Sequence, residues 1–141
     1  MQEALRNLVL KLVGCPYIWG GGNPWTGFDC SGFLVWVFQV FAQLPSGDWT
    51  AQELHDRFAA MLNRGEYMVG LGDLVFYGAG PDRITHVMLG LGNGLVIGAS
   101  GGGHTTTTID EARRRGAQVK VKPITYRSDA VDCARTSELF K

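Results

Sequence analysis

The feature that most constrains the fold is a long apolar run that follows a short polar segment. The polar segment contains Asp29, Cys30 and Ser31, and among residues 34–41 only Gln39 is polar. A run this long and this apolar is buried on all sides. Its β-branched and aromatic side chains also suit a strand, but its length and the Asp/Ser pair before it favour a capped helix. We therefore expect a buried helix that begins near Cys30.

The position of Cys30 at the start of this helix suits a reactive thiol. Unpaired backbone N–H groups and the positive end of the helix dipole favour an anion there. Helix N-termini lower the pKa of cysteine thiols, so we expect a depressed pKa for Cys30 and faster alkylation than at Cys15 or Cys133. The alternative is a small buried cysteine that packs the start of the helix.

The composition limits the number of domains and the classes of partner. A chain of 141 residues fits one domain, so we expect residues 1–141 to form a single domain. Thirteen basic and thirteen acidic side chains cancel, which does not favour binding to nucleic acid. No stretch approaches the roughly 20 apolar residues of a membrane span. The three cysteines lack CxxC spacing, so free thiols are expected, with no metal site and no cofactor.

The order of helical and strand patterns predicts an α+β fold. Helices are expected over residues 3–13, 51–63 and 109–116, in addition to the central helix. His55, inside the second of these, is expected at the surface. Asn93-Gly94 predicts a hairpin turn, and the last strand is expected to bury Val131 or Cys133. The expected strands are residues 73–77, 86–91, 95–99, 118–122 (an exposed edge strand) and 130–134.

Residues 15–27 are too rich in glycine and proline for regular structure, yet they carry three large aromatic side chains. We expect Trp19 to line a cleft that leads to Cys30. Trp25 either lines the same cleft or covers the core. A cysteine nucleophile needs a base within hydrogen-bond reach and a group that orients that base. His86, which opens a strand after a loop, is the expected base.

Five short motifs occur together in a fixed order. They are Pro16-Tyr17-x-Trp19-Gly20-Gly21, Asp29-Cys30-Ser31-Gly32-Phe33, Gly72-Asp73-Leu74-Val75-Phe76, His86-Val87 and Leu91-Gly92-Asn93-Gly94. Over roughly residues 5–100 the chain thereby resembles the NlpC family of papain-like cysteine endopeptidases, which cut the peptide stems of peptidoglycan. The linked motifs make the resemblance specific, whereas none of them alone would do so.

The resemblance implies a papain-like, NlpC-type α+β domain in which the catalytic helix packs on an antiparallel β-sheet. It implies Cys30 as nucleophile, His86 as general base and Tyr17 near the oxyanion. It places Asp29 and Ser31 at the substrate-binding end of the helix. Family members commonly cleave between D-γ-glutamate and a diamino acid. Peptidoglycan stem peptides or muropeptides are therefore the expected substrates.

The chemistry of these residues agrees with the implied roles. The backbone N–H of Cys30 can donate to a tetrahedral oxyanion, and the Tyr17 hydroxyl can add a second donor. Asp29 suits a substrate ammonium group and suits the helix N-cap equally well.

The chain departs from the family pattern at one position. The family usually has a second histidine on the strand after the Asn-Gly turn, where this chain has Gly98. The group that orients His86 is then Ser100, His104, a backbone carbonyl or water. His104 follows three glycines, whose loop has the freedom to fold back over the sheet edge, so we expect His104 to orient His86. The alternative is that His104 is a solvated loop residue.

The expected function is a peptidoglycan endopeptidase with a Cys-His thiol mechanism. The alternative is a catalytically weakened wall-binding or phage tail structural module with the same fold. The intact pair of Cys30 and His86 favours the enzyme, and the missing histidine favours the module. An acyltransferase or amidase acting on lipids or small amides is a third class.

The first residues lack the pattern of an export signal. We therefore expect synthesis in the cytoplasm. Delivery to the wall would then depend on a phage tail, a secretion apparatus or similar machinery, unless the substrate is wall fragments recycled inside the cell.

Overall fold

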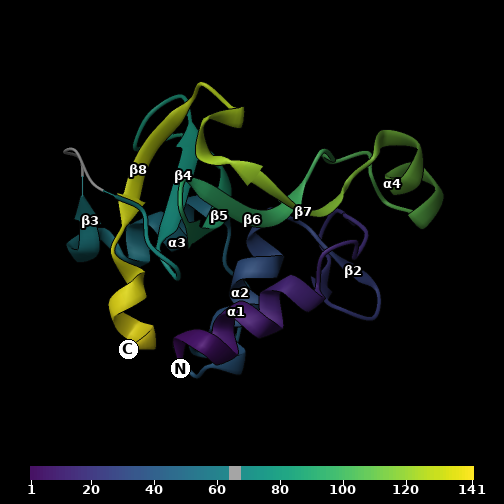
Figure 1. Cartoon of the computed structure of the whole chain (residues 1–141). Helices are drawn as coiled ribbons and strands as arrows, with labels where there is room; N and C mark the ends of the chain where they lie inside the picture. Colours follow the sequence, from purple (N-terminus) through teal and green to yellow (C-terminus); the bar gives the residue numbers. More distant parts are fainter. Residues whose placement is uncertain (64–67) are drawn as a thin grey trace.

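A six-stranded antiparallel sheet forms one layer of the molecule, and helices pack against it (Figure 1). The structure is a computed structural model that describes residues 1–63 and 68–141. The strand order is β3-β8-β4-β5-β6-β7, and every pair of neighbours is antiparallel. The strands are β3 (Leu62–Asn63), β4 (Leu74–Gly78), β5 (Ile84–Gly92), β6 (Leu95–Ser100), β7 (Gln118–Pro123) and β8 (Ala130–Ala134).

The helices and one small hairpin complete the fold. Helices α2 and α3 contact β5, and α2 also contacts β6. This arrangement confirms the expected α+β class, with the helix that begins at Cys30 packed on an antiparallel sheet. The helices are α1 (Gln2–Lys11), α2 (Cys30–Val40), α3 (Ala51–Arg57) and α4 (Ile109–Arg115), with 3₁₀ turns η1 (Ala59–Met61), η2 (Ile124–Tyr126) and η3 (Thr136–Phe140), and the hairpin joins β1 (Gly22–Asn23) to β2 (Gly27–Phe28).

Helix α2 forms where the sequence predicts it because its start is capped and its sides are apolar. The Asp29 carboxylate accepts a hydrogen bond from the backbone N–H of Gly32 at 2.7 Å. Phe33, Leu34 and Phe38 are completely buried, so the helix runs through the core. A side chain in place of Gly32 would collide with the carbonyl oxygen of Gly21, which explains why glycine follows the capping segment.

The hairpin turn between β5 and β6 is also confirmed. Asn93 and Gly94 have φ of 55° and 77°, the left-handed conformation that a two-residue turn of this kind requires. Strand β7 lies at the edge of the sheet, as its alternating sequence predicts.

The second predicted helix is wrong in its length. Residues 51–63 were expected to be helical, but α3 ends at Arg57 and the chain continues through η1 into β3. Strand β3 pairs with β8, with Leu62 opposite Ala134, so tertiary pairing replaces the last turns of the helix. Apolar spacing alone does not reveal this pairing, because the partner strand lies far along the sequence.

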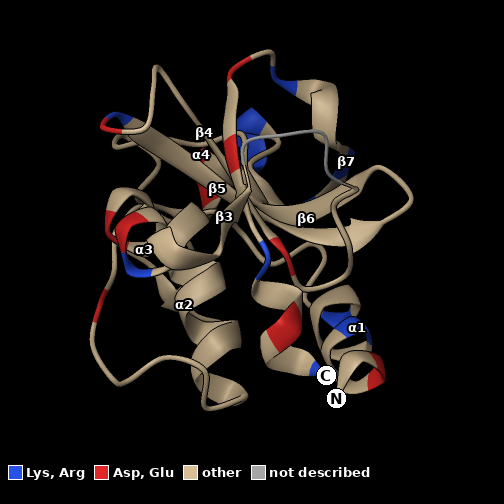
Figure 2. Ribbon diagram, turned by 90° about the vertical axis from the view of Figure 1, so that its left-hand side faces the viewer, with Lys and Arg blue, Asp and Glu red and all other residues tan. Residues whose placement is uncertain are grey.

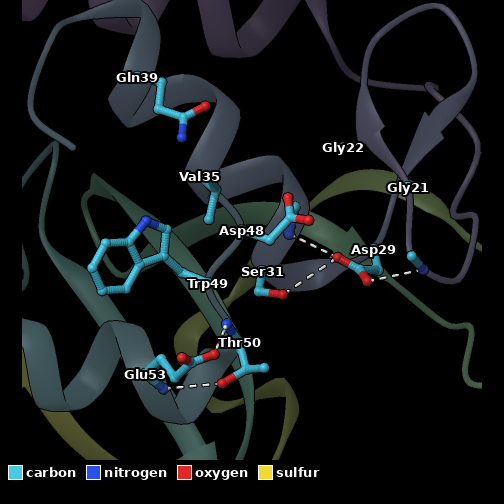
Figure 3. A pocket seen from close by; sticks show the side chains of 12 residues that line it. Gly21, Gly22, Asp29, Ser31, Val35, Gln39, Asp48, Trp49, Thr50 and Glu53 are labelled. Carbon is cyan, nitrogen blue, oxygen red and sulfur yellow. Dashed lines mark hydrogen bonds between the residues drawn. The ribbon is translucent and has the colours of Figure 1, made fainter. Parts of the chain in front are cut away.

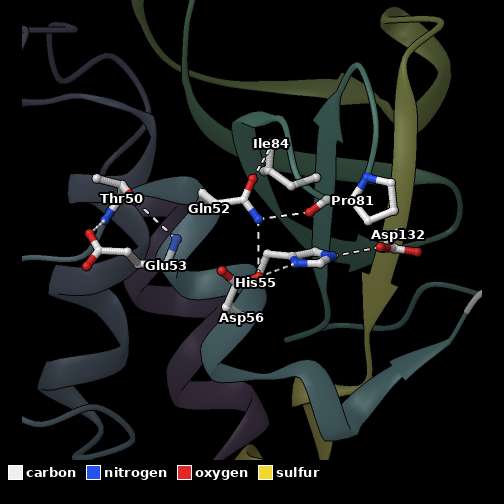
Figure 4. Close-up of polar contacts among 8 residues, drawn as sticks. All are labelled: Thr50, Gln52, Glu53, His55, Asp56, Pro81, Ile84 and Asp132. Carbon is white, nitrogen blue, oxygen red and sulfur yellow. Dashed lines mark hydrogen bonds and ion pairs between the residues drawn. The ribbon is translucent and has the colours of Figure 1, made fainter.

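Two expectations about burial are corrected by one interaction (Figure 4). His55 is only 4% exposed, and its Nε2 lies 2.7 Å from the carboxylate of Asp132 in β8. Strand β8 therefore buries Asp132 and Ala134, while Val131 and Cys133 are only partly buried. The imidazole also lies edge-on to Phe76, with ring centroids 5.1 Å apart. The buried His55–Asp132 pair thus connects α3 to strand β8 of the sheet.

Replacement of His55 by alanine should lower the free energy of unfolding by about 3–5 kcal/mol, because it removes one partner of a buried polar pair. Asp56→Ala is the matched control. It removes the exposed carboxylate that lies 3.0 Å from Nδ1 of the same ring, and it should cost less than about 1 kcal/mol. Denaturant unfolding measures both changes, and equal costs would contradict the structural role of the buried pair.

Candidate active site

Cys30 is the first residue of α2, and its sulfur lies against the strand that carries His86. The thiol Sγ is 3.9 Å from the carbonyl oxygen of Thr85 in β5. Backbone N–H groups of Val87, Ser31 and Cys30 itself act on the sulfur and lower its pKa. The two residues that flank His86 thus both touch the thiol. The pairing of Cys30 with His86 itself stays a prediction.

The expected depressed pKa of Cys30 is not what the structure supports. Burial, followed by the negative charge of Asp29, raises the pKa of Cys30 to about 11. The backbone donors at the helix start act in the opposite direction but are outweighed. The carboxylate that caps the helix therefore opposes the helix dipole, and the resting thiol of the free protein is protonated at neutral pH.

His86 is buried and is held through one ring nitrogen. Its exposed fraction is 6%, and Nε2 lies 2.7 Å from the hydroxyl oxygen of Tyr126 in η2. The same hydroxyl lies 3.1 Å from Oγ of Ser100 at the end of β6. Nδ1 makes no hydrogen bond to any residue in the described part of the chain. Burial and the nearby positive charge of Arg127 lower the pKa of His86 to about 4, so the imidazole is neutral at neutral pH.

Tyr126 is the residue that sequence reasoning missed. It lies beyond roughly residue 100, where the resemblance to the NlpC family ends, and a tyrosine in a short turn between two strands carries no recognisable signal. Only the fold brings η2 over the sheet face that carries His86. Ser100, by contrast, was considered as a candidate, and it reaches His86 only through Tyr126.

The orienting role expected for His104 needs correction. Its ring lies edge-on to Trp19, with centroids 6.3 Å apart, and Tyr126 occupies the nitrogen of His86 that an orienting group would bind. His104 is exposed, and Trp19 is 53% exposed. The glycine loop before His104 does fold back, but its Gly102 packs against the ring of Tyr17 and not over His86.

Tyr17 lies close to the candidate nucleophile. It is 5% exposed, and burial and the charges of Cys30 and Asp29 raise the pKa of its hydroxyl. The hydroxyl therefore keeps its proton. It makes no hydrogen bond to the residues that the structure describes, so it remains available as a donor.

Asp29 and Ser31 line a pocket of about 230 Å³ between the starts of α2 and α3 (Figure 3). Oδ2 of Asp29 accepts from the backbone N–H of Gly20 at 3.0 Å, and Ser31 donates to Oδ1 at 3.4 Å. Among the described residues that line the pocket, three are acidic and none is basic, the other two carboxylates being Asp48 and Glu53. The pocket thus favours a positively charged group.

No cluster of three or more histidine, cysteine, aspartate or glutamate side chains with the arrangement of a metal site occurs within residues 1–63 and 68–141. Over those residues, no helix has the length and apolar character needed to cross a bilayer.

The site contains a cysteine at the start of a helix, a buried histidine in β5 and a polar pocket. Comparison with known proteins assigns the chain to a family. Residues 14–122 match the model of the NlpC/P60 family. The chain belongs to the NlpC/P60 family. The match includes Cys30, His86 and His104, and it ends just before Tyr126.

Two bacterial relatives are more than 30% identical to this chain. The bifunctional muramidase/DL-endopeptidase CwlT of Bacillus subtilis is 41% identical over 104 residues, which are 72% of this chain and 30% of CwlT. The murein DD-endopeptidase MepH of Escherichia coli is 35% identical over 101 residues, which are 69% of this chain and 36% of MepH. The chain thus spans about a third of the length of these NlpC/P60 proteins.

Solved structures of NlpC/P60 domains have the same fold. The NlpC/p60 domain of the peptidoglycan hydrolase SagA superposes with a TM-score of 0.70 at 28% identity, over 95% of this chain and 97% of that domain. The peptidoglycan hydrolase RipB of Mycobacterium tuberculosis gives a TM-score of 0.66 at 25% identity, over 96% of this chain and 64% of that one.

Alkylation by iodoacetamide tests the raised pKa of Cys30. Because the thiolate reacts, the rate at Cys30 should keep rising with pH toward about 11, with no plateau near neutrality. Cys133 is the internal control, since burial raises the pKa of its thiol to about 12. Mass spectrometry of the labelled peptides measures both rates. A plateau at Cys30 below about pH 8.5, the ordinary pKa of a thiol, would contradict the structure.

Proposed function

We propose that this NlpC/P60 domain is a peptidoglycan endopeptidase in which Cys30 is the nucleophile and His86 the general base. The observation that carries the proposal is the contact of Cys30 Sγ with the strand residues on either side of His86. The names of CwlT, MepH and SagA support peptidoglycan as the substrate. Figure 2 shows basic and acidic residues interspersed along the chain, so charge points to no polyanionic partner.

The proposed reaction begins with proton transfer from the thiol to Nδ1 of His86. The sulfur attacks the carbonyl carbon of the scissile amide, and the carbonyl oxygen takes the negative charge. The backbone N–H of Cys30 and the Tyr17 hydroxyl donate to this oxyanion. Collapse of the intermediate breaks the C–N bond, and His86 returns the proton to the departing amine.

A thioester then joins the acyl part of the stem peptide to Cys30. Water attacks it while Nδ1 of His86 takes the proton from that water. The carbon–sulfur bond breaks, the acyl group leaves as a carboxylic acid, and the proton on His86 returns to the thiolate. The cycle consumes one water and restores the thiol and the neutral imidazole.

For the scissile bond we propose the one between D-γ-glutamate and the diamino acid. The DL-endopeptidase CwlT, at 41% identity, supports this choice over the DD specificity in the name of MepH, at 35%. The acidic pocket lined by Asp29 and Ser31 suits an ammonium group of the stem. We place the exposed indole of Trp19, which precedes the lining residue Gly20 in sequence, at the rim of this pocket. We place His104, which lies against that indole, at the same rim.

Digestion of purified muropeptides, followed by tandem mass spectrometry, tests the function and the bond together. Wild type should yield products with a new free amine on the diamino acid. Cys30→Ala should lower the rate by at least about 10³-fold, because the attacking atom is lost. Cys133→Ala is the matched control, a thiol of β8 that the mechanism does not use. Intact muropeptides after incubation with folded wild type would favour the wall-binding module, and a new amine elsewhere would correct the bond.

The pH dependence of kcat/KM tests the identity of the base. His86 must be neutral to accept a proton, so activity is present above its pKa and is lost as pH falls through about 4. Between about pH 5 and pH 8, above that pKa and below the ordinary thiol value, kcat/KM should be nearly constant. An acid limb close to pH 6.5, the value of an unperturbed histidine, would show that a solvated base is used instead.

A further inference from the structure

We propose that Tyr126 is the positioning residue of His86, and that Ser100 completes a chain of hydroxyl groups that fixes the tautomer of the imidazole. The proposal rests on the proposed function, since positioning matters only if His86 acts as a base. Tyr126 would do in this chain what a histidine at position 98 usually does in the family that the sequence resembles.

The geometry supplies a continuous line of polar atoms from three separate elements. His86 lies in β5, Tyr126 in η2 and Ser100 at the end of β6. Nε2 of His86 and the Tyr126 hydroxyl are 2.7 Å apart, and the hydroxyl is 3.1 Å from Oγ of Ser100. His86 and Ser100 are 6% and 8% exposed, so water competes little for these bonds.

Position 98 is closed to an orienting side chain in this molecule. A Cβ atom built on Gly98 would lie 2.6 Å from Sδ of Met88, and Met88 is completely buried. Met88 follows His86 on the same face of β5, so its side chain fills the space toward which a residue at position 98 would project. A side chain at position 98 would need Met88 to move, whereas the hydroxyl of Tyr126 reaches His86 from η2 without such a change.

The mechanism assigns a direction to the hydrogen bonds. Nδ1 can accept the thiol proton only if the ring proton resides on Nε2. Nε2–H then donates to the Tyr126 oxygen, and the Tyr126 hydroxyl donates to Oγ of Ser100. In the opposite direction Tyr126 would donate to Nε2, Nδ1 would carry the proton, and the base would be blocked. When Nδ1 takes the thiol proton, the Tyr126 oxygen still accepts from Nε2 of the imidazolium.

The turn that carries Tyr126 is fixed against the sheet. The hydroxyl of Tyr77 donates to the carbonyl oxygen of Ile124 at 2.9 Å. The Arg127 guanidinium lies 5.5 Å from the centre of the Tyr77 ring and pairs with Asp129 at 2.6 Å. Tyr77, Tyr126, Arg127 and Asp129 are the titratable groups that lie near His86 on this side, away from the thiol of Cys30 that the mechanism pairs with Nδ1. A rigid turn is what a positioning residue requires, because a misplacement of about 1 Å can cost about 10²-fold in rate.

The decisive measurement is the tautomer of His86, which is independent of any substrate. Long-range ¹H–¹⁵N correlation spectra should show wild-type His86 as a single Nε2–H tautomer. Tyr126→Phe removes only the hydroxyl and should give a mixture of tautomers. Thr136→Val is the matched control, since it removes another buried hydroxyl, one that donates to the carbonyl oxygen of Gly72 at 2.7 Å. It should leave the His86 signals unchanged.

The kinetic measurement separates positioning from substrate binding. Tyr126→Phe should lower kcat on muropeptides by about 10²-fold. KM should change by less than about twofold, because Tyr126 is not among the residues that line the pocket of Figure 3. Ser100→Ala should produce a smaller loss of the same kind, and it carries the test if Tyr126→Phe does not fold. A single Nε2–H tautomer in folded Tyr126→Phe would overturn the proposal, and the same result in Ser100→Ala would overturn it if Tyr126→Phe does not fold.

The two readouts keep this proposal distinct from the proposed function. If folded wild type does not cleave muropeptides, the endopeptidase assignment fails, whatever the spectra show. If wild type cleaves them and Tyr126→Phe retains one Nε2–H tautomer, only the role of Tyr126 fails.

Discussion

The site depends on the hydrogen bonds that the carboxylate of Asp29 accepts. Its two oxygens accept from the backbone N–H groups of Gly20 and Gly32, so one side chain joins the glycine-rich loop to the first turn of α2. The backbone N–H of Asp29 also donates to the carbonyl oxygen of Gly21, at 3.0 Å. Because Asp29 directly precedes Cys30 and Gly32 follows it closely, these bonds fix the helix start against the loop. An N-cap of this type contributes about 0.5–2 kcal/mol to stability, and here it also sets the position of Cys30, the proposed nucleophile.

The register of the β-sheet determines which residues lie next to His86. Strand β5 pairs with β4 so that His86 lies opposite Tyr77, and the hydroxyl of Tyr77 anchors the turn that carries Tyr126. His86, the proposed base, and the turn that carries Tyr126 thus depend on the same cross-strand pair. On the other side of the sheet, the buried His55–Asp132 pair connects α3 to β8. Both connections join residues that are far apart in the sequence.

The sequence predicts well those features that follow from local patterns. The cap at Asp29, the apolar helix after it and the Asn93-Gly94 turn each have a physical signal within a few residues, and the structure contains all three. It predicts poorly what depends on distant partners. The length of α3 was wrong because β3 pairs with β8, and His55 was placed at the surface because nothing near it in sequence announces Asp132.

The same distinction explains the orienting group of His86. The empty position at Gly98 is visible in the sequence, but the residue that compensates for it is not, because Tyr126 enters from a turn between β7 and β8. The histidine that follows Gly98 most closely in the sequence is His104, and the sequence therefore favours it. In the structure Met88 crowds position 98, and the hydroxyl that reaches Nε2 of His86 comes from η2.

Two opposing electrostatic effects act on the pKa of Cys30 at the start of α2. The helix dipole and the backbone donors near Cys30 favour a thiolate, whereas the charge of Asp29 and the burial of the sulfur favour the thiol. Burial and Arg127 keep the imidazole of His86 neutral as well. Cys30 and His86 are therefore both uncharged in the free protein at neutral pH and form no ion pair with each other. In the proposed mechanism the thiol then gives up its proton when a substrate carbonyl is in place, so that the anion forms where the oxyanion donors can receive the negative charge.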